Sequence, residues 1–282
     1  MLRRRTISLQ LCPQPTATKG NAMQTVLFDT DASICTITLN KPHKRNAVDR
    51  AMAADLHAAF ERFEADASLR VAILTGAGDH FCGGADLSAI GDPDLRNELD
   101  AEGGGSGPMG PTRMALSKPL IAAVNGYAVA GGLELALLAD LRVADEDAVF
   151  GVFCRRWGVP LIDGGTVRLP RIIGMARALD MILTGRPVSA TEAFEMGLVN
   201  RLTRVGGAPA EAQELAHQIA SFPQQCMLTD RRSAYEQWDL PLGEALRHEG
   251  KQGVPIVLAE GKEGAARFTF GFGRHGRFGD EG

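Results

Sequence analysis

The strongest constraint on the fold is an apolar stretch over residues 119–140, which reads PLIAAVNGYAVAGGLELALLAD. It predicts a buried strand at 120–124, then the glycine pair Gly131 and Gly132, and a helix with Glu134 in its first turn. Backbone amides at a helix start lack partners and carry a partial positive charge, so this turn suits an anion. The apolar surroundings, without Lys, Ser or Thr at phosphate-loop spacing, favour a small developing charge over a phosphate. Glu134 would then be placed to act as an acid or a base.

A glycine pair before a helix is equally expected where two backbone segments merely pack closely. A second segment of the same kind shifts the balance. Residues 80–87, HFCGGADL, follow a compact apolar strand at 70–74 and place Gly83 and Gly84 just before a helix start, with Asp86 as a possible cap. Two amide donors from separate loops are what an oxyanion hole requires.

Strand and helix patterns alternate along the chain, which predicts an α/β protein with a mostly parallel sheet. Two short strands, residues 25–28 and 34–39, suit a hairpin, and apolar residues recur on one face of a helix over 49–65. The glycine-rich segment 91–111 is predicted to be an unpacked, mobile loop. Further helices are predicted over residues 210–221, 223–237 and 242–260.

Composition excludes several kinds of partner. With 282 residues, 45% of them hydrophobic, the chain can bury the core of one large domain with an appended helical region. A net charge of -4 gives no reason to expect a nucleic-acid surface, and no apolar run is long enough to predict a membrane span. Five scattered cysteines fit no disulfide framework, and with six dispersed histidines they predict no metal site. Reduced thiols in the cytoplasm are the simpler expectation.

The first 22 residues differ from the rest of the chain. They contain Arg3, Arg4 and Arg5, several hydroxyl residues and no acid. This composition resembles an organelle transit peptide, and an upstream extension of the start site would look similar. We predict that residues 1–22 form a disordered extension outside the fold, and an organelle location if they are a transit peptide.

Five motifs in order resemble the crotonase superfamily, the group of enoyl-CoA hydratases and isomerases, from about Gln24 to the C-terminus. Each motif alone is weak, but the ordered set is specific. The motifs are TLNKPHKRNAV (38–48), FCGGADL (81–87), KPLIAAVNGYAVAGGLELALLAD (118–140), DGGTVRLPRIIG (163–174) and LTGRPVSATEAFEMGLVN (183–200).

The resemblance implies a crotonase (ClpP-like) spiral of ββα units with a C-terminal helical trimerisation region. Residues 23–205 would form the core domain and residues 206–282 the helical region, which related proteins use to build homotrimers, often paired into hexamers. The segment 91–111 would border the acyl pocket, although a plain surface loop is equally expected.

The resemblance also implies a binding site for an acyl-CoA thioester, with no cofactor because coenzyme A is part of the substrate. Backbone N–H groups of Ala85 and Gly131 would hold the thioester oxygen and stabilise an enolate. Lys44 and Arg45 match the loop that meets the CoA nucleotide, although a basic pair on a loop is most often only solvated. The remaining residues expected along the bound substrate are Ala47, Gly84, Asp86, Leu87, Gly132 and Cys154.

The second catalytic carboxylate is where the chain departs from the family pattern. Hydratases of this family hold water between two glutamates; the first matches Glu134, and Cys154 occupies the second position. A neutral thiol cannot replace a carboxylate, and a small buried filler is a more ordinary role for it than a nucleophile. Asp163 is the candidate substitute, and a cap for the helix at Thr166 is its structural alternative.

The resulting hypothesis is an acyl-CoA enzyme, an enoyl-CoA hydratase that adds water through an oxyanion-stabilised enolate. A double-bond isomerase that uses Glu134 or Asp163 without adding water is the first alternative. A CoA-thioester binding protein with negligible turnover is the second, because Cys154 replaces a carboxylate.

Overall fold

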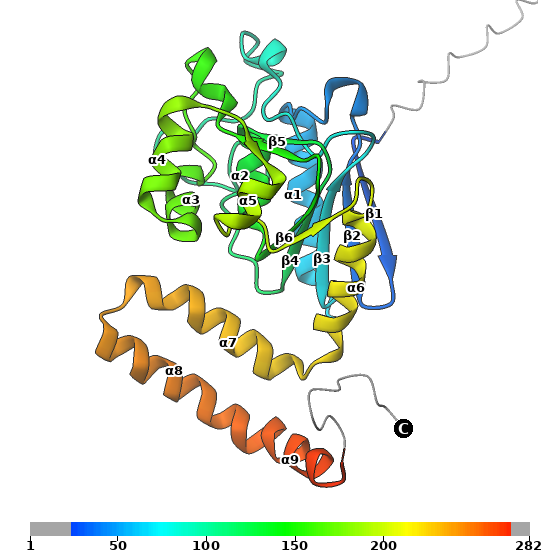
Figure 1. The fold of residues 1–282 in the computed structure, drawn as a ribbon, viewed down its shortest axis with the longest axis vertical. Helices are drawn as coiled ribbons and strands as arrows, with labels where there is room; N and C mark the ends of the chain where they lie inside the picture. The colour runs from blue at the N-terminus through cyan, green and yellow to red at the C-terminus, as the bar shows by residue number, and fades with distance from the viewer. Residues whose placement is uncertain (1–23, 272–282) are drawn as a thin grey trace, which may run out of the picture.

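The computed structural model describes residues 24–271, and the predicted N-terminal extension lies outside this range. Its main sheet has six strands in the order β1-β2-β3-β4-β6-β9, and a smaller sheet has the order β5-β7-β8 (Figure 1). All neighbours in the main sheet from β2 onward are parallel, which confirms the predicted mostly parallel sheet. The strands are β1 Val26–Asp31, β2 Ile34–Leu39, β3 Val71–Gly76, β4 Leu120–Val124, β5 Tyr127–Val129, β6 Leu141–Asp145, β7 Val149–Gly151, β8 Val188–Ser189 and β9 Arg201–Thr203.

The main sheet is covered on both faces, because its central strands are apolar on both sides. In β3, Ala72 and Leu74 belong to the larger core cluster, whereas Val71 and Ile73 belong to a second cluster on the other face. Successive side chains of a strand point to opposite faces of the sheet, so odd- and even-numbered residues of β3 enter different clusters. Helices α1 (Arg50–Ala65) and α6 (Ala208–Ser221) contribute the apolar residues that complete the two clusters.

The predicted hairpin and first helix are both confirmed. Strands β1 and β2 pair antiparallel with Val26 opposite Leu39. Helix α1 begins after Asp49, whose side chain accepts a hydrogen bond from the backbone N–H of Met52. Its buried face includes Met52, Leu56 and Phe60, in line with the apolar period of the sequence. The remaining helices are α2 Gly131–Leu138, α3 Gly165–Ile173, α4 Met175–Thr184, α5 Ala190–Glu195, α7 Gln224–Glu236, α8 Leu242–Ile256 and α9 Lys262–Thr269.

The three predicted C-terminal helices are present, as α6, α7 and α8. Helices α7 and α8 form an antiparallel pair that stands apart from the α/β core, and α9 continues the line of α8 (Figure 1). Arg231 of α7 connects this pair to the core through Asp140 at 2.9 Å and the carbonyl oxygen of Leu116 at 2.7 Å. The domain division at residue 205 and the trimerisation role stay predictions. Among the described helices, none is both long and apolar enough to cross a bilayer.

The segment 91–111 contains neither helix nor strand, as predicted, but it is not unpacked throughout. Met109 is 1% exposed, and the buried Asn97 side chain donates a 2.8 Å hydrogen bond to the carbonyl oxygen of Pro108. The expectation of an unpacked loop is therefore wrong for its C-terminal part. The cause is the contact that this part makes with the start of α2, where Met109 packs against Gly131.

Candidate active site

A cavity of about 640 Å³ lies beside the N-terminus of α2. Its walls come from the two glycine motifs, both halves of segment 91–111, residues 153–157 and the loop before α3. The predicted site residues that line this cavity are Arg45, Ala85, Leu87, Gly131, Glu134, Cys154 and Asp163. The other predicted residues, Lys44, Ala47, Gly84, Asp86 and Gly132, are not part of its wall. The fold therefore places both candidate carboxylates and both candidate backbone donors on the same cavity.

The backbone N–H of Ala85 is directed away from the neighbouring loop by a short parallel bridge with Val48. Val48 donates a 2.9 Å hydrogen bond to the carbonyl oxygen of Gly84 and accepts one of 2.9 Å from the N–H of Asp86. Residues alternate along an extended segment, so the N–H of Ala85 points to the opposite side. Within residues 24–271 this N–H has no hydrogen-bond acceptor, and Ala85 lines the cavity.

Gly131 is the first residue of α2, so its N–H has no acceptor inside the helix. In the described part of the chain it has none elsewhere either. The preceding Ala130 has φ 53° and ψ −126°, an uncommon backbone conformation that turns strand β5 into the helix. A Cβ placed on Gly84 would lie 3.1 Å from the nitrogen of Gly131, so the two glycine motifs are in direct contact. Two free N–H groups on touching segments form a candidate oxyanion hole.

Gly132 allows two backbone segments to pack closely, which was the alternative explanation for the glycine pair. A Cβ at this position would lie 2.1 Å from the carbonyl oxygen of Cys82, which leaves no room for a side chain. The two glycines thus differ: Gly132 permits close packing, whereas Gly131 also presents a free N–H to the cavity.

Glu134 is buried at the cavity wall with 2% of its surface exposed. Its Oε1 accepts hydrogen bonds of 2.8 Å from the backbone N–H groups of Asp163 and Gly165. Burial, together with the nearby charge of Asp163, raises the pKa of Glu134 to about 7. A carboxyl group with a pKa near neutrality can both give and take a proton, as a general acid or base must.

Asp163 faces the same cavity and is 4% exposed. Its Oδ1 accepts hydrogen bonds from the hydroxyl of Thr112 and from the N–H of Met109, the latter at 2.9 Å. Burial raises its pKa, although these two hydrogen bonds oppose the rise. The alternative that Asp163 caps α3 is wrong, because the cap residue is Gly164 and no side chain caps that helix.

Cys154 lies in a short 3-10 helix, Phe153–Trp157, and lines the cavity with 7% of its surface exposed. Burial and the charge of Glu134 raise the pKa of its thiol, even though Arg155 acts in the opposite direction. The thiol is therefore neutral near pH 7, which does not favour an activated nucleophile.

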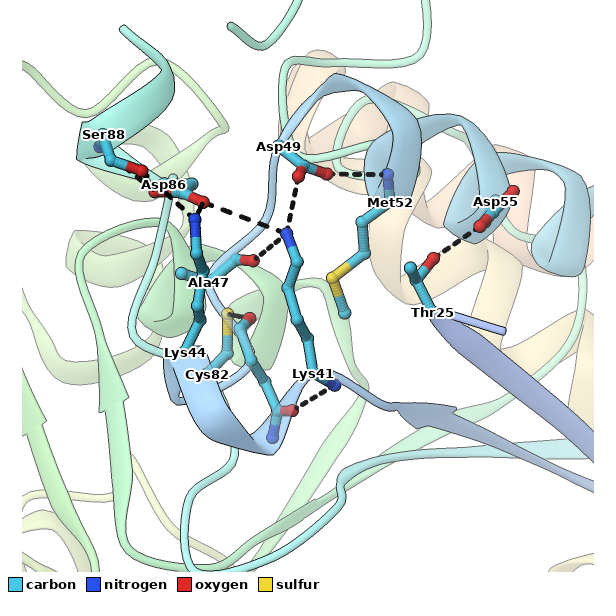
Figure 2. Close-up of polar contacts among 11 residues, drawn as sticks. Thr25, Lys41, Lys44, Ala47, Asp49, Met52, Asp55, Cys82, Asp86 and Ser88 are labelled. Atoms are coloured by element: carbon cyan, nitrogen blue, oxygen red, sulfur yellow. Dashed lines mark hydrogen bonds and ion pairs between the residues drawn. The ribbon is translucent and has the colours of Figure 1, made fainter. Parts of the chain in front are cut away.

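Lys44 and Asp86 form an ion pair next to the cavity. Lys44 Nζ lies 2.6 Å from Asp86 Oδ2, and Lys41 Nζ lies 3.9 Å from the same oxygen and 2.6 Å from Asp49 Oδ2 (Figure 2). Asp86 also caps the short helix Leu87–Ala89 by accepting from the N–H of Ser88, which confirms the predicted cap. The ammonium group of Lys44 is thus already paired with Asp86. Contact of Lys44 with a CoA phosphate stays a prediction.

Several residues that line or support the site were not predicted, among them Met109, Thr112 and Arg168. Met109 and Thr112 lie in an irregular segment without hydrophobic periodicity, so no pattern signals their burial. Arg168 donates to the carbonyl oxygens of Thr112 and Asp163, at 2.7 Å and 3.1 Å. Within the described residues, no group of three or more His, Cys, Asp or Glu is arranged to hold a metal ion.

The chain is similar to known proteins over most of its length. A family profile described as enoyl-CoA hydratase/isomerase matches residues 29–268. The chain is 37% identical over 241 residues to the enoyl-CoA hydratase EchA19 of Mycobacterium tuberculosis, which covers 83% of this chain and 89% of that protein. It is 40% identical over 200 residues to the carnitinyl-CoA dehydratase of Proteus mirabilis, covering 70% of this chain and 75% of the relative.

Solved structures share the fold over nearly the same span. The crystal structure of an enoyl-CoA hydratase from Mycobacterium tuberculosis H37Rv superposes with a TM-score of 0.81 and 38% identity, covering 88% of this chain and 96% of that one. An enoyl-CoA hydratase structure from Bacillus anthracis has a TM-score of 0.78 and 32% identity, covering 88% and 96%. The predicted spiral α/β fold is therefore confirmed.

Proposed function

The chain belongs to the enoyl-CoA hydratase/isomerase family, and we propose that it adds water across the 2,3 double bond of an enoyl-CoA thioester. The observation that carries this proposal is the placement of two buried carboxyl groups, Glu134 and Asp163, on the same cavity as the free N–H groups of Ala85 and Gly131. Hydration of a conjugated thioester needs both a proton-transfer pair and a site for negative charge.

The two N–H groups stabilise the charge that develops during addition. When water attacks the β-carbon, the electron pair of the double bond moves toward the thioester carbonyl and its oxygen becomes an enolate oxygen. Ala85 and Gly131 donate to that oxygen, and these hydrogen bonds strengthen as the charge grows. Loss of one such donor raises a barrier by about 3 to 4 kcal/mol in systems where this has been measured.

Glu134 and Asp163 divide the proton transfers between them. Asp163 accepts the proton that the attacking water loses, and Glu134 donates a proton to the α-carbon as the enolate collapses. This assignment follows the electrostatics, because burial and the charge of Asp163 raise the pKa of Glu134 to about 7 and favour its protonated form. The net reaction adds one water, and the two carboxyl groups exchange protons with solvent before the next turnover.

The binding part of the proposal extends beyond the cavity. Arg45 and Leu87 line the cavity wall that the glycine motifs form, so the pantetheine and nucleotide of CoA would run along this side. Lys44 ends the adjoining 3-10 helix Pro42–Lys44, and Ala47 and Asp86 lie in the neighbouring loops. Coenzyme A enters as part of the substrate, and we propose no separate cofactor. Exposed apolar side chains on α8, among them Leu242, Leu246 and Val254, support assembly into a homotrimer or hexamer.

Cytoplasmic location is a further part of the proposal. Cys35, Cys82 and Cys154 are buried free thiols, and Cys226 is an exposed one. Free thiols suit a reducing compartment, where disulfides are rare.

The direct test is the absorbance of the enoyl-thioester band of crotonyl-CoA on mixing with the purified protein. The band should disappear with the parent protein, whereas Glu134→Gln and Asp163→Asn should each lower kcat by about 10²- to 10⁴-fold. Retained binding of butyryl-CoA, a saturated analogue, would show that both variants keep the site intact. An unchanged band with the parent protein, despite tight butyryl-CoA binding, would exclude hydratase activity on this substrate.

Isomerase activity is the second candidate, since Cys154 stands where hydratases of this family carry a carboxylate. An isomerase moves one proton and needs no carboxylate pair around a water. A 3-enoyl-CoA substrate distinguishes the two: an isomerase produces the conjugated band, whereas a hydratase without isomerase activity leaves that substrate unchanged. If neither substrate reacts, the remaining reading is a CoA-thioester binding protein with negligible turnover.

A further inference from the structure

Within the described residues, hydrogen bonds reach only one of the two side-chain oxygens of Asp163. The buried hydroxyl of Thr112 and the backbone N–H of Met109 both donate to its Oδ1, the second at 2.9 Å. In the part of the chain that the structure describes, no group donates to Oδ2. Because Asp163 lines the cavity, Oδ2 is the oxygen left to exchange a proton with a substrate or water.

The main chains around this contact are fixed independently of the hydroxyl. Arg168 donates to the carbonyl oxygens of Thr112 and Asp163, at 2.7 Å and 3.1 Å. Arg113 donates to the carbonyl oxygen of Ile162 at 3.0 Å. Two arginines thus join the segment before Asp163 to the segment that contains Thr112. A substitution that removes only the hydroxyl should leave this cross-link in place.

Gly107 provides the space that the hydroxyl of Thr112 occupies. It has φ +105°, and a Cβ at this position would lie 2.2 Å from Thr112 Oγ1. A side chain there would displace the hydroxyl from Asp163. The backbone of the loop is therefore shaped around the oxygen that contacts the carboxyl group.

We propose that Thr112 is a positioning residue for the acid–base pair, whose hydroxyl holds the carboxylate of Asp163 with Oδ2 directed at the reacting atoms. This inference rests on the proposed function. The charges of Arg113 from the loop and Arg168 from α3 act on Asp163, and the charge of Asp163 in turn raises the pKa of Glu134 from α2. None of them replaces the donor that Thr112 supplies to Oδ1, so its loss should favour the protonated, inactive form of the base.

The test compares Thr112→Val, which keeps the shape and removes the donor, with Thr112→Ser, which keeps the donor. Crotonyl-CoA hydration is measured from pH 5 to pH 9. We expect Thr112→Val to lower kcat about 10- to 100-fold with KM changed less than about threefold, and to move the acidic limb of the profile upward by about half a unit or more. Thr112→Ser should restore both values.

Three outcomes distinguish the possibilities. A parent-like kcat and acidic limb in Thr112→Val, while Asp163→Asn abolishes activity, would overturn the inference and leave the proposed function standing. Equal losses in the Val and Ser variants with a raised KM would indicate a packing role and also overturn it. Full activity of Asp163→Asn would instead contradict the proposed function itself. If Thr112→Val does not fold, Thr112→Cys provides a similar volume with only a weak donor.

Discussion

The backbone N–H of Asp163 donates a 2.8 Å hydrogen bond to Oε1 of Glu134. Gly165 donates to the same oxygen at 2.8 Å, and a Cβ on Gly165 would lie 2.9 Å from it. The loop that carries one candidate acid therefore fixes the position of the other, although they are 29 residues apart in the chain. A displacement of this loop should therefore change the surroundings of both carboxyl groups together.

The pH dependence of hydration should report the proton on Glu134. Burial and the charge of Asp163 raise its pKa to about 7, and the protonated form is the proposed donor to the α-carbon. Activity should thus fall as pH rises through this value, by about tenfold per unit well above it. The measurement is kcat/KM for crotonyl-CoA from pH 5 to pH 9. A flat profile between pH 6 and pH 9 would show that Glu134 does not act as the acid.

Gly84→Ala should disrupt the oxyanion hole without touching either acid. The added Cβ would lie 2.9 Å from Ala130 Cβ and 3.1 Å from the nitrogen of Gly131, at a φ of +96°. We expect kcat to fall about 10²- to 10³-fold, because one backbone donor moves from its place. Gly206→Ala is the matched control, with φ +78° and no atom within 4 Å of its Cβ. Equal activity in the two variants would mean that Gly84 does not shape the site.

The regular elements were predictable because local periodicity determines them. The strand at 120–124 follows from a short continuous run of buried apolar residues, and the helix that Asp49 caps follows from buried apolar positions at a period of 3.6. The contacts of Thr112 and Met109 with Asp163 were not predictable, since they join positions 51 and 54 residues apart. The irregular segment that carries Met109 and Thr112 shows no hydrophobic periodicity. Its packing therefore depends on the assembled fold and not on any local pattern.

The site was predictable where backbone geometry forms it and less so where side chains do. The glycine motifs indicated which two loops supply the donors, because a turn that needs glycine leaves a signature in the sequence, and the family resemblance implied Ala85 and Gly131 within them. The Lys44 pair with Asp86 spans 42 residues and has no comparable signature. Asp163 was open between a cap and an acid, and the cap is excluded because Gly164 is the cap residue of α3 and no side chain caps that helix.

Asp86→Asn should destabilise the fold in a pH-dependent way. Burial would raise the pKa of Asp86, but hydrogen bonds from Lys44 and Ser88 outweigh it and the pKa is lowered. A lowered pKa gives stability that is present above the unfolded value of about 4 and is lost as pH falls through the folded value. We expect Asp86→Asn to unfold about 1 to 3 kcal/mol more easily at pH 7.

Urea unfolding at pH 7 and at pH 3 measures this effect. The difference between the parent and Asp86→Asn should shrink at pH 3, where the parent carboxyl group is increasingly protonated. The control is Asp94→Asn, which changes an exposed acid in the neighbouring loop and should leave stability unchanged at both pH values. An equal difference at both pH values would mean that the charge of Asp86 contributes nothing to the network (Figure 2).

Cys154→Ala should retain hydratase activity within about threefold, because a thiol whose pKa is raised by burial and by the charge of Glu134 is neutral and transfers no proton at pH 7. The small cavity left behind should cost about 1 kcal/mol of stability, which thermal unfolding would detect. Cys154→Ser separates size from chemistry, since it keeps the volume and replaces the thiol by a hydroxyl. A loss of 100-fold or more in both variants, with butyryl-CoA binding intact, would mean that the sulfur takes part in the reaction and that Asp163 does not act as the second group alone.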